Sequence, residues 1–217
     1  MGSSGSKNNH EEKYTNLRDH PTDIGINRYK NNDYNNCVIN NNKNDNNKKI
    51  NIIKDLEIVK NKNNDKIEIY KEKALQRHNE LRHFHGSDDL KINQDLNKMA
   101  QEKAHNLIEN QKQHFSNHLY EDEALGENIL ISNDLQIKPE EICEEWYKEN
   151  DNYDYELNKF QKGKGHFTQL VWRSSKLVGF GFEFTDDKVI AVAYYYPAGN
   201  IIGEFNENIN KKVKNIE

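Results

Sequence analysis

The carboxylate of Glu149 is placed where it can take part in chemistry. Glu149 follows Trp146 by three residues and Ile142 by seven, and this spacing puts it on the core-facing stripe of a predicted helix. A carboxylate at the end of a helix most often points into water. A partly buried carboxylate instead needs a cationic or hydrogen-bonding partner, and it can then act as a general base or a second acceptor in a site.

Histidines and a second glutamate lie in separate segments of the chain. His166 follows Gly163-Lys-Gly165, where two glycines allow a tight turn that exposes the next residue to a cleft. Glu127 stands at the edge of a probable strand, and His114 and His118 lie just before that strand. A lone histidine is more often a structural hydrogen-bonding residue than a ligand. These residues become informative only where the fold brings them together.

Three helices are predicted to position these side chains. Apolar residues at intervals of three and four predict helices over Lys66–His85, Asn93–Lys112 and Glu140–Asn150. The first helix is expected to end at Gly86 and Ser87, and the third begins after Pro139 with acidic residues in its first turn.

The pattern then changes to the alternation of a strand. Val178, Phe180, Phe182 and Phe184 alternate with two glycines and a glutamate, which predicts a strand that returns over 189–196 after a turn at 185–188. Helices followed by an antiparallel hairpin predict an α+β fold with helices packed on a sheet.

Composition excludes several classes of protein. The 217 residues carry a net charge of -5 with a pI near 6.0, which argues against a nucleic-acid-binding protein. Two cysteines, Cys37 and Cys143, are too few for a disulfide-rich scaffold or a cysteine-based zinc module. No apolar run approaches the roughly 18 residues of a membrane span, and the N-terminus lacks the apolar core of a secretory signal.

The N-terminal part of the chain has a different character. Only 34% of all residues are hydrophobic, and the deficit is concentrated near the front, where residues 31–47 are more than half Asn. We therefore expect residues 1–64 to be a mostly disordered, low-complexity extension, residues 65–210 to form the folded domain, and 211–217 to be a short tail. Within the extension, Ile50–Val59 is expected to form a short helix or strand that docks on the domain.

Five blocks of sequence resemble the signatures of one family. They are, in chain order, His78-Asn-Glu-Leu-Arg82, Gly126-Glu-Asn128, Trp146-Tyr-Lys-Glu149, Gly165-His-Phe-Thr-Gln-Leu-Val-Trp-Arg-Ser-Ser175 and Tyr194-Tyr-Tyr-Pro-Ala-Gly-Asn200. Together they resemble the CAP superfamily of cysteine-rich secretory, antigen 5 and pathogenesis-related proteins, also called SCP or TAPS domains. The form of the last two blocks is most similar to the Golgi-associated plant pathogenesis-related type.

The resemblance implies a fold and a set of site residues. The family fold is a three-layer α-β-α sandwich, in which residues 166–172 form a short helix. Its cleft holds two histidines and two glutamates, which correspond here to His166, Glu127, Glu149 and a histidine at the end of the second helix. His118 is preferred for the fourth position, with His114 as the alternative. We call these four residues the candidate tetrad.

Family members bind sterols, fatty acids or acidic phospholipids. The resemblance therefore implies a non-enzymatic module that binds lipid or sterol at membranes. A self-associating scaffold, such as a homodimer, and a metal-assisted hydrolase are the alternatives. For the latter, His118 and His166 would ligate Zn²⁺ or another divalent cation. The competing interpretation is a metal-free network in which each glutamate accepts from a histidine. No nucleophile is evident, because Cys143 is expected to be a small buried side chain.

The first six residues match a lipidation pattern. Met1-Gly-Ser-Ser-Gly-Ser6 fits N-myristoylation at Gly2, although a vector-derived Gly/Ser start has the same composition. If this N-terminus is native, we expect the protein on the cytosolic face of a membrane, and otherwise in the cytoplasm. Ala193 stands where secreted family members have a cysteine, and the chain lacks their cysteine pairs, so secretion is disfavoured.

Overall fold

The computed structural model of the protein describes residues 43–109 and 119–213. The chain divides into two units, residues 1–49 and 50–217, and residues 43–49 of the first begin helix α1. Four residues singled out from the sequence, Gly2, Cys37, His114 and His118, lie outside the described ranges. The fold described below is that of the second unit.

A four-stranded sheet in the order β1-β5-β6-β4 forms the centre of this unit. Its strands are β1 (Lys91–Ile92), β4 (Gly126–Ser132), β5 (Leu177–Phe184) and β6 (Val189–Tyr196). Strand β1 runs parallel to β5, and the other two pairs are antiparallel. A small separate ribbon joins β2 (Leu119–Tyr120) to β3 (Glu123–Ala124). The predicted hairpin over 178–196 is confirmed.

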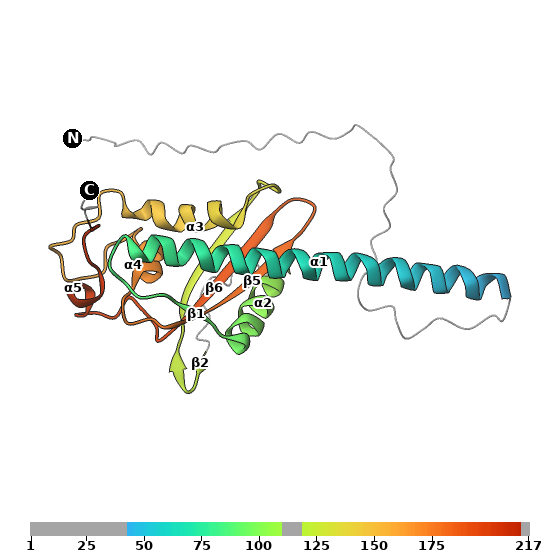
Figure 1. Ribbon diagram of the computed structural model, residues 1–217, viewed down its shortest axis with the longest axis horizontal. Helices are drawn as coiled ribbons and strands as arrows, with labels where there is room; N and C mark the ends of the chain where they lie inside the picture. The colour runs from blue at the N-terminus through green and yellow to red at the C-terminus, as the bar shows by residue number, and fades with distance from the viewer. Residues whose placement is uncertain (1–42, 110–118, 214–217) are drawn as a thin grey trace, which may run out of the picture. The chain divides into compact units, whose positions relative to one another are not determined.

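Helices cover both faces of the sheet (Figure 1). Helix α2 (Gln94–Glu109) packs on the face that carries Ile190, Val192 and Tyr194. The opposite face packs against α1 (Lys43–His83), α3 (Pro139–Tyr147) and the short α4 (Gly165–Val171). The 3₁₀ turn η1 (Lys148–Asn150) extends α3, and α5 (Phe205–Asn208) lies near the chain end. This arrangement confirms the three-layer α-β-α sandwich.

The two glycines of β5 allow the α2 layer to lie directly on the strand. A Cβ atom at Gly179 would lie 2.2 Å from the carbonyl carbon of Leu96, and one at Gly181 would lie 2.2 Å from that of Ala100. Real Cβ atoms do not approach backbone so closely, so only glycine fits at these positions. The alternating Phe180 and Phe182 point the other way and are fully buried in the larger core.

The first helix is longer than the sequence predicted. Helix α1 begins at Lys43 rather than Lys66, so residues 43–64 are helical where we expected mostly disorder. Forming the first turn of a helix is the step that costs most conformational entropy, and the C-terminal half of α1, which packs on the domain, has already formed its turns. Each residue added at the N-terminal end then gains one hydrogen bond as it is fixed, so the helix can extend. Within Ile50–Val59, which we expected to dock on the domain, the apolar side chains whose exposure the structure describes are about half exposed, namely Ile53, Ile58 and Val59, so these three do not dock.

The remaining boundaries agree closely with the sequence. Asn93 caps α2 through its side-chain oxygen, which accepts from the backbone N–H of Asp95 at 2.9 Å and of Leu96 at 3.0 Å. The short helix expected for residues 166–172 is present as α4. In the part of the chain that the structure covers, no helix is both long and apolar enough to cross a bilayer.

A buried arginine ties three of these elements together. Arg82 at the end of α1 is fully buried, and its guanidinium donates to four backbone carbonyls. These belong to Asp88 (2.8 Å), Leu170 (2.9 Å), Trp172 (2.9 Å) and Ser175 (3.2 Å). Burial lowers the pKa of Arg82 to about 10, which still leaves it charged at neutral pH. The C-terminal end of α4 is therefore held by a cation.

Candidate functional site

The side chain of Glu149 accepts hydrogen bonds from the first backbone N–H groups of α4. One carboxylate oxygen accepts from the backbone N–H of His166 at 2.7 Å and of Phe167 at 3.2 Å. The other oxygen accepts from the Nδ1–H of His166 at 2.7 Å. The carboxylate thus satisfies two of the backbone donors that a helix start leaves open, and it orients the His166 ring through a third bond.

The environment of Glu149 favours its charged form. Burial opposes the charge, but the hydrogen bond and charge of His166 and the N–H groups of Phe167 and His166 outweigh it, and the pKa of Glu149 lies below its usual value. The Glu149 side chain is 22% exposed and the His166 side chain 42%. Glu149 therefore does not simply point into water, which was the commoner expectation for a carboxylate at the end of a helix.

The Glu127 side chain is less exposed to solvent than that of Glu149 and lies beside a lysine. It sits on β4 opposite Tyr194 of β6, and its Oε2 atom is 3.8 Å from Nζ of Lys103 on α2. Both side chains are largely buried, at 13% and 5% exposure. Burial raises the pKa of Glu127, while Lys103, Tyr194 and the charge of His166 act to lower it. Its Oε2 atom is buried and is given no hydrogen-bond partner among residues 43–109 and 119–213.

A chain of hydrogen bonds links the start of α4 to the core. Asn128 donates through Nδ2 to the carbonyl of His166 at 3.0 Å and to the hydroxyl of Tyr195 at 3.2 Å. The Tyr195 hydroxyl lies 2.8 Å from Nε2 of His78, whose Nδ1–H donates to the carbonyl of Ala74. Burial lowers the pKa of His78 to about 3, so this histidine is neutral. The network positions His166 through its backbone.

Three members of the candidate tetrad can be placed. Glu149 and His166 are in direct contact, and Glu127 lies close enough to His166 for the imidazole charge to influence its pKa. The fourth member, His118 or His114, lies outside the described residues. Sequence reasoning missed Lys103 as a site residue. The sequence did contain an indication of this role, because Lys103 lies on the apolar stripe of the second predicted helix. A lysine at such a position is buried and needs an acidic partner.

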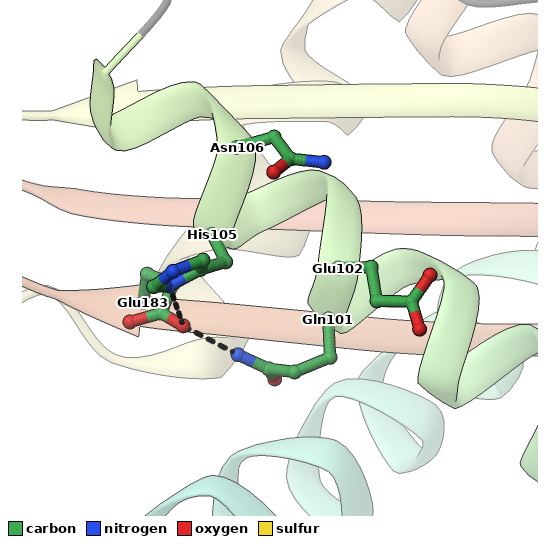
Figure 2. Close-up of a pocket in the computed structure, with 5 residues that line it drawn as sticks. All are labelled: Gln101, Glu102, His105, Asn106 and Glu183. Carbon is green, nitrogen blue, oxygen red and sulfur yellow. Dashed lines mark hydrogen bonds and ion pairs between the residues drawn. The ribbon is translucent and has the colours of Figure 1, made fainter. Parts of the chain in front are cut away.

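Figure 2 shows a depression beside α2. Its lining residues are Gln101, Glu102, His105, Asn106 and Glu183. Gln101 donates to Glu183 at 2.9 Å, and Nδ1 of His105 lies 3.4 Å from the same oxygen, as the dashed lines show. Glu127, Glu149 and His166, the three tetrad residues that the structure describes, do not line this depression, so it offers no support for their chemistry.

Comparisons with known proteins place these features in context. The family model described as "Cysteine-rich secretory protein family" matches residues 75–195. A curated relative, the Golgi-associated plant pathogenesis-related protein 1 of Homo sapiens, is 34% identical over 143 residues, which cover 64% of this chain and 92% of the relative.

Solved structures show the same fold at lower identity. The venom allergen-like protein 4 of Schistosoma mansoni has a TM-score of 0.52 at 20% identity, covering 67% of this chain and 95% of that protein. A structure of NaASP2 described as containing Zn²⁺ has a TM-score of 0.47 at 24% identity, covering 66% and 85%. The second likeness is too low to bear on a metal in this chain.

Replacing the Glu149 carboxylate tests its role at α4. We expect Glu149→Gln to lower the free energy of unfolding by about 1–2 kcal/mol at pH 7, because a neutral amide cannot accept all three bonds. The pKa of Glu149 is lowered by folding, so its stabilisation is present above the unfolded value near 4.3 and is lost as pH falls through the folded value. The difference between wild type and variant should therefore shrink below about pH 4 in urea unfolding.

Glu145→Gln is the matched control for this experiment. Glu145 lies one helical turn earlier and forms an exposed ion pair with Lys148, so its replacement should change stability by less than about 0.5 kcal/mol. Equal losses in the two variants at pH 7 would show that Glu149 does not support α4.

Proposed function

The chain belongs to the CAP family of cysteine-rich secretory proteins, and from this premise we propose that it is a non-enzymatic module that binds lipids or sterols at membranes. The observation that carries the non-enzymatic part is the state of Glu149. Both of its oxygens are already engaged by α4 and His166. Three internal bonds explain the position of this carboxylate through its support of α4 and His166, with no substrate needed to account for it.

The other reactive side chains support the same conclusion. Cys143 is fully buried with a free thiol, and burial raises its pKa well above the usual value. A thiol held in this form is a poor nucleophile. Glu127 faces the Lys103 ammonium, so its charge is already countered within the protein. The family resemblance and the Golgi association named for the human relative support the choice of a lipid ligand at a membrane.

Mass spectrometry of the native protein with its co-purified small molecules tests the ligand class. We expect a lipid or sterol in near-stoichiometric amount that the protein then transfers to acceptor vesicles. Protein unfolded in urea and carried through the same purification is the control, because it retains non-specific lipid only. Equal lipid in both samples, together with no transfer, would rule out the proposal.

We propose membrane attachment through Gly2, which places the protein on the cytosolic face of a membrane. A single myristoyl chain binds membranes with a constant on the order of 10⁴ M⁻¹, so a second contact is needed for stable attachment. Gly2→Ala should move most of the protein from the membrane to the soluble fraction in cell fractionation. Gly5→Ala, which keeps the acceptor residue, should leave the distribution unchanged. If Gly2→Ala also leaves it unchanged, the N-terminus is not the anchor.

A metal-assisted activity is a second candidate, favoured by the orientation of His166. Because its Nδ1–H donates to Glu149, its Nε2 atom is the nitrogen left for a ligand, an arrangement common in metal sites. Among the described residues, no three histidine, cysteine or acidic side chains are grouped to hold a metal, so a second imidazole must come from His118 or His114. These donors fit a weakly held Zn²⁺, which would supply a Lewis acid that activates water.

Titration calorimetry with Zn²⁺ tests this metal site. His166→Ala should weaken binding at least tenfold, and so should replacement of His118 if that histidine is the second ligand. His105→Ala should have no effect, because His105 is an exposed histidine of the separate depression near Glu183. Affinity should fall as pH drops through roughly 6.5, where free imidazole takes up a proton. Undiminished Zn²⁺ binding by His166→Ala would place any metal elsewhere.

A further inference from the structure

The two outer edges of the central sheet differ in how they are covered. At one edge, β1 pairs with the start of β5, and side chains of α2 cover more of that strand. Asn97 accepts through Oδ1 from the backbone N–H of Phe180 at 2.8 Å. Gln101, which Figure 2 shows reaching toward β5, accepts from the N–H of Phe182 at 3.1 Å and donates to its carbonyl at 2.9 Å. These two amides take the place of a neighbouring strand.

Strand β4 forms the other edge, because β6 is its only neighbouring strand among the described residues. The register shows which backbone groups of β4 point outward. Phe180 directs its N–H away from β6, so Ala193 opposite it directs its own backbone groups toward β4, where its partner is Asn128. This direction alternates along a strand, so Ile129 and Ile131 direct their N–H and C=O groups away from the sheet.

The outward backbone groups of Ile129 and Ile131 are open to a partner. Within residues 43–109 and 119–213, neither residue has a backbone hydrogen bond outside the β4–β6 pair. Their side chains pack against the α2 layer and that of Leu130 packs against the opposite core, so the strand is held from both faces. Strand Gly126–Ser132 has no proline or lysine, and its single charge is Glu127. It therefore lacks the residues that commonly block pairing at a sheet edge.

Carboxylates lie before and after this strand. Glu121, Asp122 and Glu123 precede β4 and Asp134 follows it, and all four residues are exposed. None of them forms an ion pair with another described residue. Glu121 accepts from the hydroxyl of Tyr196 at 3.2 Å, and this neutral partner leaves its charge uncompensated. We call residues 121–134 the β4 edge. A strand that pairs with it meets negative charge at each end.

These charges distinguish between two kinds of partner strand. A second copy of the chain could place its own β4 antiparallel to this one, with the two-fold axis at Ile129. Asp134 of each copy would then lie beside Glu123 of the other. Like charges placed opposite each other in a sheet are destabilising. A segment that carries lysine or arginine at both ends would instead meet a carboxylate at each end, so the charges favour such a segment over a second copy.

We propose that the β4 edge binds an extended segment of another protein as a fifth strand of the four-stranded sheet. Backbone hydrogen bonds to Ile129 and Ile131 hold the segment, and the carboxylates select lysine or arginine at both of its ends. Apolar side chains at every second position of the segment extend the apolar face of the sheet. This inference does not depend on the proposed lipid function, because it names a strand edge that binds a peptide.

Fluorescence anisotropy of the full chain with a labelled peptide tests the proposal. The probe is KKTVTVTVKK, in which valine alternates with threonine between two pairs of lysines. We expect saturable binding with a Kd below about 1 mM. Two control peptides should bind at least tenfold more weakly. One is EETVTVTVEE, and the other is the probe N-methylated at its central valine and threonine, so that neither of its edges is intact. The absence of probe binding up to about 1 mM overturns the proposal.

Variants of the chain locate the binding. Ile129→Pro removes an outward N–H and should weaken probe binding at least tenfold, whereas Ile129→Val keeps this N–H and should bind as the wild type does. Asp122→Lys with Asp134→Lys should reverse the preference between the two charged peptides. Glu102→Lys with Glu207→Lys is the control, because both are exposed acids outside the β4 edge, and it should leave the preference unchanged. Thermal unfolding checks that each variant is folded. Equal binding by all of these variants overturns the proposal.

Amide hydrogen exchange followed by NMR decides the question even if the proline variant fails to fold. With saturating probe, the N–H groups of Ile129 and Ile131 should exchange at least tenfold more slowly. Those of Phe180 and Phe182 already bond to side chains of α2 and should not change. Unchanged exchange at Ile129 places the peptide elsewhere and overturns the proposal. If the protein without peptide shows the same protection in a concentration-dependent way, a second copy occupies the edge and the proposal is wrong.

Discussion

Opposite charges at the two ends of α4 are the constraint on which the described site depends. Helix α4 has only seven residues, too few to be stable alone. The Glu149 carboxylate accepts from the first N–H groups of α4, and the buried Arg82 guanidinium donates to the carbonyls of Leu170 and Trp172 at its C-terminal end. Each charge complements the helix dipole at its end. Removing Arg82 would leave the buried carbonyls of Leu170, Trp172 and Ser175 to find new partners, so this arginine joins α1, α4 and the segment that leads into β5.

Most of the residues that identify the family serve this same helix. Gln169 on α4 accepts from the backbone N–H of Gly199 at 2.8 Å, and its other side-chain atom donates to Ser175. Asn128 donates to the carbonyl of His166, and the hydroxyl of Tyr195 accepts from the same Asn128 amide. The signature blocks are far apart in sequence because they lie on different elements that meet at α4. A carboxylate beside a histidine is consequently no sign of catalysis by itself, since here it also completes a helix.

The sequence predicted the features that depend on local pattern. The alternation around Phe180 and Phe182 predicts the hairpin, and Asn93 before an apolar stripe predicts the start of α2. Features that depend on contacts between residues far apart in the sequence could not be predicted from the local pattern. Gly179 and Gly181 are needed because the α2 backbone at Leu96 and Ala100 leaves no room for a Cβ atom. These contacts join residues that are far apart in the sequence, so the local pattern did not indicate them. The polar composition of residues 43–64 suggested disorder, whereas a helix already formed by packing extends through them.

The segment before His166 shows how one pattern can have two physical causes. The glycines of Gly163-Lys-Gly165 predicted a tight turn that exposes the histidine. Gly163 does make such a turn, with a φ of +73°. Gly165 has a different role, because the space that a Cβ would need borders the ring of Phe160. The exposed loop and the start of α4 therefore share one contact, and a larger residue at position 165 would displace Phe160 before it disturbed the His166 backbone.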